Sequence, residues 1–168
     1  MDSEKEFERI FKETSRMIYG LGQRLFRNEE DALDFVQDVY LEAYSKRDRF
    51  QGRSRYSTYL YSFALHRGLN RIRKTKRVQF EEWKEEDFPQ VESELTPPGN
   101  VAPHILREEL NLLPEVYRLP LVLHYYEKMS CAQIGASLSM NENTVKSYLH
   151  RGRKILKTKI EARQNETE

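Results

Sequence analysis

The stretch from Ser130 to Lys157 constrains the fold most strongly, because its residues predict two helices joined by a tight turn. Ser130 and Gln133 can form a capping box, in which each side chain satisfies a free amide of the first helical turn. After a turn at Ser139–Met140, Asn141 offers a side-chain oxygen that can cap a second helix. The stretch therefore predicts a helix-turn-helix.

The second helix of this pair has an apolar stripe on one face and polar side chains opposite. At about 100° per residue, the apolar face holds Val145, Leu149, Gly152 and Leu156. The candidate duplex-DNA contacts are Asn143, Thr144, Lys146, Ser147, His150 and Arg151. A polar and cationic surface opposite a packed stripe suits a helix in the major groove of DNA. A helical hairpin with a solvated basic face is the alternative that this stretch alone leaves open.

Charge along the chain is strongly uneven, although the net charge of the 168 residues is only +1. Residues 46–77 contain eleven basic side chains and one acid, whereas residues 81–94 contain seven acids and one lysine. Bulk charge therefore gives no argument for nucleic-acid binding, but the distribution predicts separate surfaces for separate partners. At 38% apolar and 33% charged residues, we expect a lean core.

No feature of the sequence indicates an enzyme, a metal site or a cofactor. The four histidines lack the mutual spacing of metal ligands, and the single cysteine, Cys131, excludes an internal disulfide and makes a zinc site a poor hypothesis. Neither a signal peptide nor a membrane-spanning run is visible, so we expect no membrane insertion and a cytoplasmic location.

Two amphipathic helices are expected in the first part of the chain, over residues 4–25 and after a cap at Asn28. The buried face of the second should hold Ala32, Val36, Val39, Tyr40 and Ala43. Its other face aligns Asp34, Gln37, Asp38 and Leu41. Leu41 on an acidic face has no packing explanation within the helix, so it is either a scattered exposed leucine or part of a docking surface for a basic partner.

A loop over residues 50–57 is expected to lead into a basic helix over residues 58–76. The buried stripe of that helix should be Tyr61, Leu65, Gly68, Leu69 and Ile72. The opposite side gathers Tyr59, Phe63, His66, Arg67, Asn70, Arg71 and Lys74. Interleaved rings and cations are what unstacked bases and phosphates require, which favours nucleic-acid contact over a merely solvated basic face.

The pattern as a whole predicts an all-α protein of two small helical domains joined by a flexible linker. We expect a first domain over residues 1–77, an acidic, proline-containing linker over residues 78–103, and a second domain over residues 104–160 with a polar tail at 161–168. Within the second domain, helices are expected over residues 104–112 and 115–127. The core of the latter should be Val116, Leu119, Val122, Leu123 and Tyr126. Pro120 should kink it or end it early.

Three motifs in this order resemble the bacterial RNA polymerase sigma factors of the extracytoplasmic-function (ECF) class. DALDFVQDVYLEAY (31–44) is similar to region 2.2 of that family, FQGRSRYSTYLYSFA (50–64) to its following loop and helix, and residues 112–156 to region 4. The resemblance implies a factor without catalysis of its own that directs core RNA polymerase to promoters. It also implies docking on the β′ coiled coil and the β flap, and an anti-sigma factor as a partner.

The resemblance assigns roles to the candidate residues. Asp34, Gln37, Asp38 and Leu41 would dock on the polymerase. The loop residues Gly52, Arg53, Ser54, Arg55, Tyr56 and Ser57 would capture a base flipped from the −10 element. The basic helix would hold that element, and the last helix would read the −35 element as duplex. Arg53, Tyr59, His66, Asn70 and Ser139 depart from the residues common in the family.

Two other hypotheses belong to different functional classes. One is a stand-alone helix-turn-helix regulator that binds duplex DNA as a dimer, and the other is a nonspecific RNA-binding protein. Neither of them needs the acidic docking face together with the aromatic and basic helix.

Overall fold

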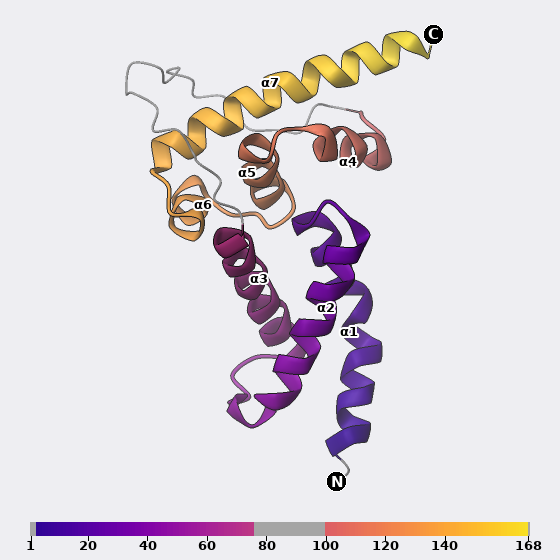
Figure 1. The fold of residues 1–168 in the computed structure, drawn as a ribbon, viewed down its shortest axis with the longest axis vertical. Coiled ribbons are helices and arrows are strands. Elements are labelled where there is room, and N and C mark those ends of the chain that lie inside the picture. Colours follow the sequence, from indigo (N-terminus) through magenta and orange to yellow (C-terminus); the bar gives the residue numbers. More distant parts are fainter. Residues whose placement is uncertain (1–2, 76–99, 168) are drawn as a thin grey trace. The chain divides into compact units, whose positions relative to one another are not determined.

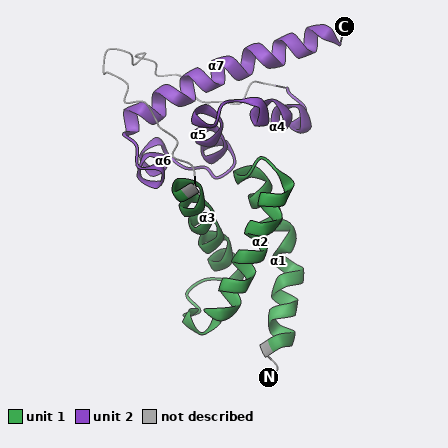
Figure 2. Ribbon diagram, viewed as in Figure 1, with its two compact units in different colours: residues 1–76 green, residues 77–168 purple. Residues whose placement is uncertain are grey.

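The computed structural model describes residues 3–75 and 100–167, and within these two segments the chain is helical and contains no strand (Figure 1). The chain divides into two compact units, residues 1–76 and 77–168 (Figure 2). The prediction of an all-α protein is therefore confirmed. Most of the expected linker, including its aromatic residues, lies outside the described residues.

Unit 1 consists of α1 (Ser3–Leu25), α2 (Glu29–Ser45), the short 3-10 helix η1 (Arg47–Arg49) and α3 (Tyr56–Thr75), with the three long helices packed on one another. Asn28 caps α2 as predicted, because its Oδ1 accepts a hydrogen bond of 2.7 Å from the amide of Asp31. Helix α3 begins at Tyr56, two residues before the expected start.

The core of unit 1 contains most of the predicted residues of α2 and α3 and differs at three positions. Those buried as predicted are Ala32, Val39, Tyr40, Ala43, Gly68, Leu69 and Ile72. Phe35 is buried and Val36 is only half-buried, and Leu60 and Ala64 are fully covered where Tyr61 and Leu65 were expected. Because α3 packs against both α1 and α2, its buried face points between them. Gly68 lies at this contact, where a Cβ would come within 2.5 Å of Leu25 Cδ1.

Unit 2 consists of α4 (Pro103–Leu112), α5 (Glu115–Tyr125), α6 (Cys131–Leu138) and α7 (Glu142–Glu166). Pro120 is buried inside α5 without ending it, whereas Tyr126 lies beyond the helix and is 39% exposed instead of in the core. The core of α5 also holds Arg118, whose fully buried guanidinium group donates two hydrogen bonds to the Glu115 carboxylate, of 2.7 and 2.8 Å.

Helix α7 continues to Glu166, so residues 161–166 are helical where a polar tail was expected. Arg163 lies on this extension and contacts α4, where its guanidinium is 2.7 Å from a carboxylate oxygen of Glu108 and 3.2 Å from one of Glu109. These two carboxylates hold the pKa of Arg163 above its ordinary value. None of the described helices combines the length and the apolar character needed to cross a membrane.

The predicted helix-turn-helix is present as α6 and α7. Ser130 and Gln133 form the capping box, with hydrogen bonds of 2.9 and 3.1 Å between side chains and backbone amides. Asn141 caps α7 by accepting a hydrogen bond of 2.9 Å from the amide of Asn143. Ser139 makes the turn in the left-handed region, with φ 56° and ψ 44°, a conformation that a glycine adopts at lower cost.

Candidate nucleic-acid and protein interfaces

The predicted docking residues of α2 are all exposed. Asp34, Gln37, Asp38 and Leu41 face solvent, and Leu41 is 64% exposed, the largest exposed fraction among the big apolar side chains of unit 1. The structure nevertheless divides these four residues between two surfaces, one that faces α1 and one that faces α3.

The surface that faces α1 is an apolar groove of about 620 Å³. Gln37 and Leu41 line it together with Glu4, Phe7, Phe11, Leu33, Val36, Tyr40 and Tyr44. Phe11, Leu33 and Tyr44 are, like Leu41, large apolar side chains that remain exposed. The sequence analysis missed Leu33, which lies about 80° from Leu41 around the helix, with Gln37 midway between them. We call these residues the α1–α2 groove.

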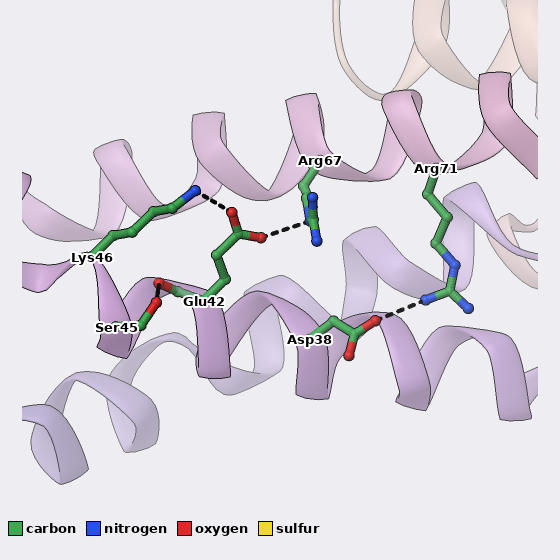
Figure 3. A network of polar contacts seen from close by, with 6 residues as sticks. All are labelled: Asp38, Glu42, Ser45, Lys46, Arg67 and Arg71. Carbon is green, nitrogen blue, oxygen red and sulfur yellow. Dashed lines mark hydrogen bonds and ion pairs between the residues drawn. The ribbon is translucent and has the colours of Figure 1, made fainter.

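The surface that faces α3 carries the two aspartates. Asp34 Oδ2 lies 2.8 Å from Nη2 of Arg71, and Asp38 Oδ2 lies 3.4 Å from its Nη1. Figure 3 shows Arg71 of α3 reaching across to Asp38 of α2. The Arg71 guanidinium also lies over the Phe26 ring, 5.4 Å from its centroid. A predicted docking surface and a predicted DNA-binding residue are therefore in direct contact.

A second link between α2 and α3 involves Glu42, which the sequence analysis did not identify. Glu42 lies between Lys46, to which it is paired, and Arg67, whose Nε is 2.8 Å from Glu42 Oε2 (Figure 3). Its side chain is only 19% exposed, whereas that of Arg67 is 49% exposed. The Lys46 ammonium also lies over the ring of Phe63, 5.9 Å from its centroid.

The predicted base-capture residues form two groups. Gly52, with φ 68°, and its neighbours Arg53 and Ser54 are exposed at the loop. Tyr56 and Ser57 are not loop residues, since they belong to the first turn of α3. Together with Arg55, these two line a cavity of about 610 Å³ against α1 and η1. The early start of α3 therefore places their side chains on a helix end instead of a loop.

A row of aromatic rings follows this helix start. The ring centroid of Phe50 is 5.0 Å from that of Tyr56 and 5.2 Å from that of Tyr59, and Tyr59 stacks on Phe63 at 6.4 Å. All four rings are half-buried, so each keeps part of its surface in solvent. Burial raises the pKa of the Tyr56 hydroxyl, which hydrogen-bonds to none of the described residues.

The remaining predicted contacts on α3 lie further along the same helix. His66 and Lys74 are exposed, and Asn70 is half-buried, where its side-chain oxygen accepts a hydrogen bond from Arg73. A pocket of about 210 Å³ brings several of these residues together. It is lined by Phe35, Asp38, Arg67, Asn70, Arg71 and Lys74.

The predicted duplex contacts on α7 are accessible with one exception. Asn143 and Lys146 are exposed, and Thr144, His150 and Arg151 are half-buried. Ser147 differs from the expectation of an accessible contact, because its side chain is only 2% exposed and is covered in this structure. An ideal wheel places Ser147 opposite Val145, but α5 and α6 both pack against α7 and cover the helix on more than one side.

No group of three or more histidine, cysteine, aspartate or glutamate side chains could hold a metal ion in the described parts of the chain. Cys131 is half-buried near the start of α6, and burial raises the pKa of its thiol. A raised pKa lowers the fraction of reactive thiolate at neutral pH. The described surfaces present aromatic rings, arginines and exposed apolar side chains.

Comparisons with known proteins give a family for each of the two units. Residues 10–78 match the family model for sigma-70 region 2, and residues 104–156 match that for sigma-70 region 4. The chain is 28% identical over 154 residues to the ECF RNA polymerase sigma factor SigW of Bacillus subtilis (strain 168), a match that covers 85% of this chain and 82% of SigW. It is 26% identical over 166 residues to the ECF RNA polymerase sigma factor SigE of Mycolicibacterium smegmatis, a match that covers 96% of this chain and 64% of SigE.

The fold is also found among solved structures. The sigma factor RpoE of Bartonella quintana, crystallised in complex with the anti-sigma factor NepR, matches with a TM-score of 0.54 and 22% sequence identity over 94% of this chain and 98% of that one. Both family models, in the order region 2 then region 4, fall on the two compact units. The chain belongs to the sigma-70 family of RNA polymerase sigma factors, in its extracytoplasmic-function class.

Proposed function

We propose that this sigma factor binds core RNA polymerase in the bacterial cytoplasm and directs it to a set of promoters, without catalysis of its own. The observation that supports the proposal is that unit 1 has two different exposed surfaces on neighbouring helices. An exposed apolar groove with flanking aspartates lies on α2, and a row of rings and arginines lies on the neighbouring α3. A protein that only bound duplex DNA would need neither surface.

The α1–α2 groove is the proposed docking surface for the β′ coiled coil of the polymerase. Leu41 and Leu33 are more than half exposed there, and burying such side chains in an interface is favourable by about 25 cal/mol for each Å² of apolar surface. Asp34 and Asp38 at its side suit a partner that carries basic residues. Unit 2 would dock separately, on the β flap.

The start of α3 is the proposed site of −10 recognition. A base flipped from its duplex would enter the cavity lined by Arg55, Tyr56 and Ser57, beside the rings of Tyr59 and Phe63. Unstacking and unpairing a base costs about a few kcal/mol. Stacking on aromatic rings returns about 1–3 kcal/mol per base, so the aromatic row can offset this cost.

The start of α7 is the proposed reader of the −35 element. Asn143 and Lys146 project from its first two turns, and Thr144, His150 and Arg151 keep part of their surface in solvent. Base edges in the major groove can be read by amide and cationic side chains in this position. An anti-sigma factor is a further proposed partner, since RpoE of Bartonella quintana was crystallised with one.

Run-off transcription tests the proposal directly. The purified chain is added to core RNA polymerase with fragmented genomic DNA of its source as template, and the transcript starts are mapped. We expect defined starts that share one upstream sequence and disappear when the chain is omitted. Binding of duplex DNA without any specific initiation would support the stand-alone regulator instead.

A further inference from the structure

Lys46 and Arg67 contact one carboxylate, that of Glu42, from two different helices. Lys46 is the C-cap residue of α2 and is paired with Glu42 Oε1, and Arg67 of α3 places its Nε 2.8 Å from Glu42 Oε2 (Figure 3). The Glu42 side chain is only 19% exposed, whereas those of Lys46 and Arg67 are 38% and 49% exposed. The acid is therefore the covered member of this trio, and its two cations are open to solvent.

Arg67 is held in a way that leaves its terminal nitrogens available. Its ion pair with Glu42 uses Nε, and neither Nη1 nor Nη2 contacts an acceptor among the described residues. Arg71, one helical turn later on α3, differs, because both of its terminal nitrogens face carboxylates of α2. A guanidinium binds a phosphate best through two parallel N–H groups. Arg67 therefore keeps free the part of its side chain that recognises phosphate.

The ring of Phe63 lies beside both cations. Lys46 Nζ is 5.9 Å from its centroid, and Arg67 follows Phe63 by four residues, the spacing of neighbours on one face of a helix. Phe63 also stacks on Tyr59 and keeps part of its surface in solvent. Single-stranded nucleic acid is bound by rings that stack on its bases and by cations that contact its phosphates. The trio places two such cations next to such a ring.

Glu42 has two opposite effects on a phosphate that approaches Lys46 and Arg67. Its negative charge repels the phosphate. Its ion pairs also restrain two long side chains that would otherwise lose rotamer freedom on binding, and they offset the repulsion between the two cations. We expect the second effect to be the larger one, since both cations neutralise the carboxylate and the phosphate meets the exposed cations first.

We propose that Glu42 is a positioning residue for single-stranded DNA, which holds Lys46 and Arg67 beside Phe63 so that the two cations bind phosphates of the strand. The inference rests on the proposed function, because it takes α3 as the helix that meets the opened −10 element. It adds an acid of α2 that itself contacts no DNA and acts only through its two cations.

Two substitutions of Glu42 separate position from charge. Glu42→Asp keeps the charge on a side chain too short to reach both cations, and Glu42→Gln removes the charge with little change of shape. The full-length chain is titrated against a short fluorescein-labelled single-stranded DNA of mixed sequence, with fluorescence anisotropy as the readout. We expect both variants to weaken binding about two- to fivefold. The control is Glu30→Gln, at an exposed position of the same helix, which should leave binding unchanged or slightly tighter.

A double-mutant cycle shows whether Glu42 acts through its cations. Glu42→Gln is repeated in a Lys46→Ala, Arg67→Ala background, in which no cation is left to position. Its effect should change sign there, from weaker to slightly tighter binding, because only the lost repulsion remains. Lys46→Ala and Arg67→Ala alone should each weaken binding and make its dependence on salt shallower. Circular dichroism checks that each variant keeps its helices, and the single variants decide the test if the triple variant does not fold.

The outcomes separate this inference from the proposed function. Tighter or unchanged binding by either Glu42 variant would overturn the positioning role, because the acid would then only compete for its cations. An equal loss for Glu42→Gln in the two backgrounds would also overturn it, since the effect would not pass through Lys46 and Arg67. Unchanged binding by both Lys46→Ala and Arg67→Ala would instead remove this part of α3 from the DNA interface, and so contradict the proposed function itself.

Discussion

Ser147 shows how tertiary packing overrides a helical wheel at a single residue. It lies two positions after Val145 and one after Lys146, yet only Lys146 of the polar pair is exposed. The hydroxyl of Ser147 is buried and hydrogen-bonds to none of the described residues. An unsatisfied buried hydroxyl contributes nothing to DNA affinity and costs stability.

Alanine substitutions of Ser147 and Lys146, made one at a time, should have separate effects on protein stability and on DNA binding. Ser147→Ala should leave duplex binding unchanged and raise the free energy of unfolding by about 1 kcal/mol, because it removes an unsatisfied polar group. Lys146→Ala should leave the stability nearly unchanged and weaken duplex binding, with a shallower dependence on salt. Urea unfolding and anisotropy titrations with a promoter duplex measure the two effects. Loss of binding by Ser147→Ala would restore it as a DNA contact.

The residues whose burial was not predicted from the sequence have one physical cause in common. Caps could be predicted from neighbours alone, so Asn28, Ser130 and Asn141 all cap helices as expected. Burial depends on elements far away in the chain. Arg118 in α5 is fully buried and is hydrogen-bonded to Glu115. From the sequence alone, a charged residue in a short helix is expected to be exposed to solvent.

At the scale of elements, α2 has two exposed faces that make different contacts. Its α1 side supplies Leu33 and Leu41 to the α1–α2 groove, and its α3 side pairs Asp34 and Asp38 with Arg71. The spacing of residues along α2 predicted that this face is exposed but not that it is divided. The division arises because α1 and α3 flank α2, a fact that no spacing within one helix contains.

The α1–α2 groove gives a prediction for docking. Leu41→Arg places a charge at the most exposed apolar position of the groove, so it should weaken binding to core RNA polymerase at least tenfold, as loss of a buried apolar anchor does. Duplex DNA binding through unit 2 should remain. Ala162→Arg, on an exposed position of α7, makes the same change of charge away from the groove and serves as control. Competition binding with labelled core measures both variants, and equal affinities for the two would remove the groove from the docking surface.

At the scale of the whole molecule, the sequence predicted two helical units, but it did not predict that the last helix extends through residues 161–166. The composition changes from basic to acidic after residue 77, and the chain divides into its two units between residues 76 and 77. The end of unit 2 was misplaced, because residues 161–166 have little apolar character. Ile160 is nevertheless buried, and Arg163 pairs with Glu108 and Glu109 of α4. Contacts between the first and last helices of a unit leave no local signal.

Both units bury tyrosines, and this gives the molecule a common sensitivity to high pH. Burial raises the pKa of Tyr40 and Tyr56 in unit 1 and of Tyr125 in unit 2 above the ordinary value of 10.0. A tyrosine whose pKa is raised in the folded state favours folding while it is neutral. Its contribution is fully present below the pKa of the unfolded chain and is lost as the pH rises through the folded pKa.

The contribution of these tyrosines to the free energy of unfolding should therefore be constant through the neutral range and fall above about pH 10. Tyr125→Phe should make this fall shallower, because it removes a titrating hydroxyl that hydrogen-bonds to none of the described residues. Tyr40→Phe is the informative contrast. It also makes the fall shallower, but it lowers stability at neutral pH, since the Tyr40 hydroxyl is hydrogen-bonded to Thr14 Oγ1 at 2.7 Å. Urea unfolding followed by circular dichroism at neutral and alkaline pH measures these slopes, and a Tyr125→Phe slope equal to that of the wild type would contradict the assignment.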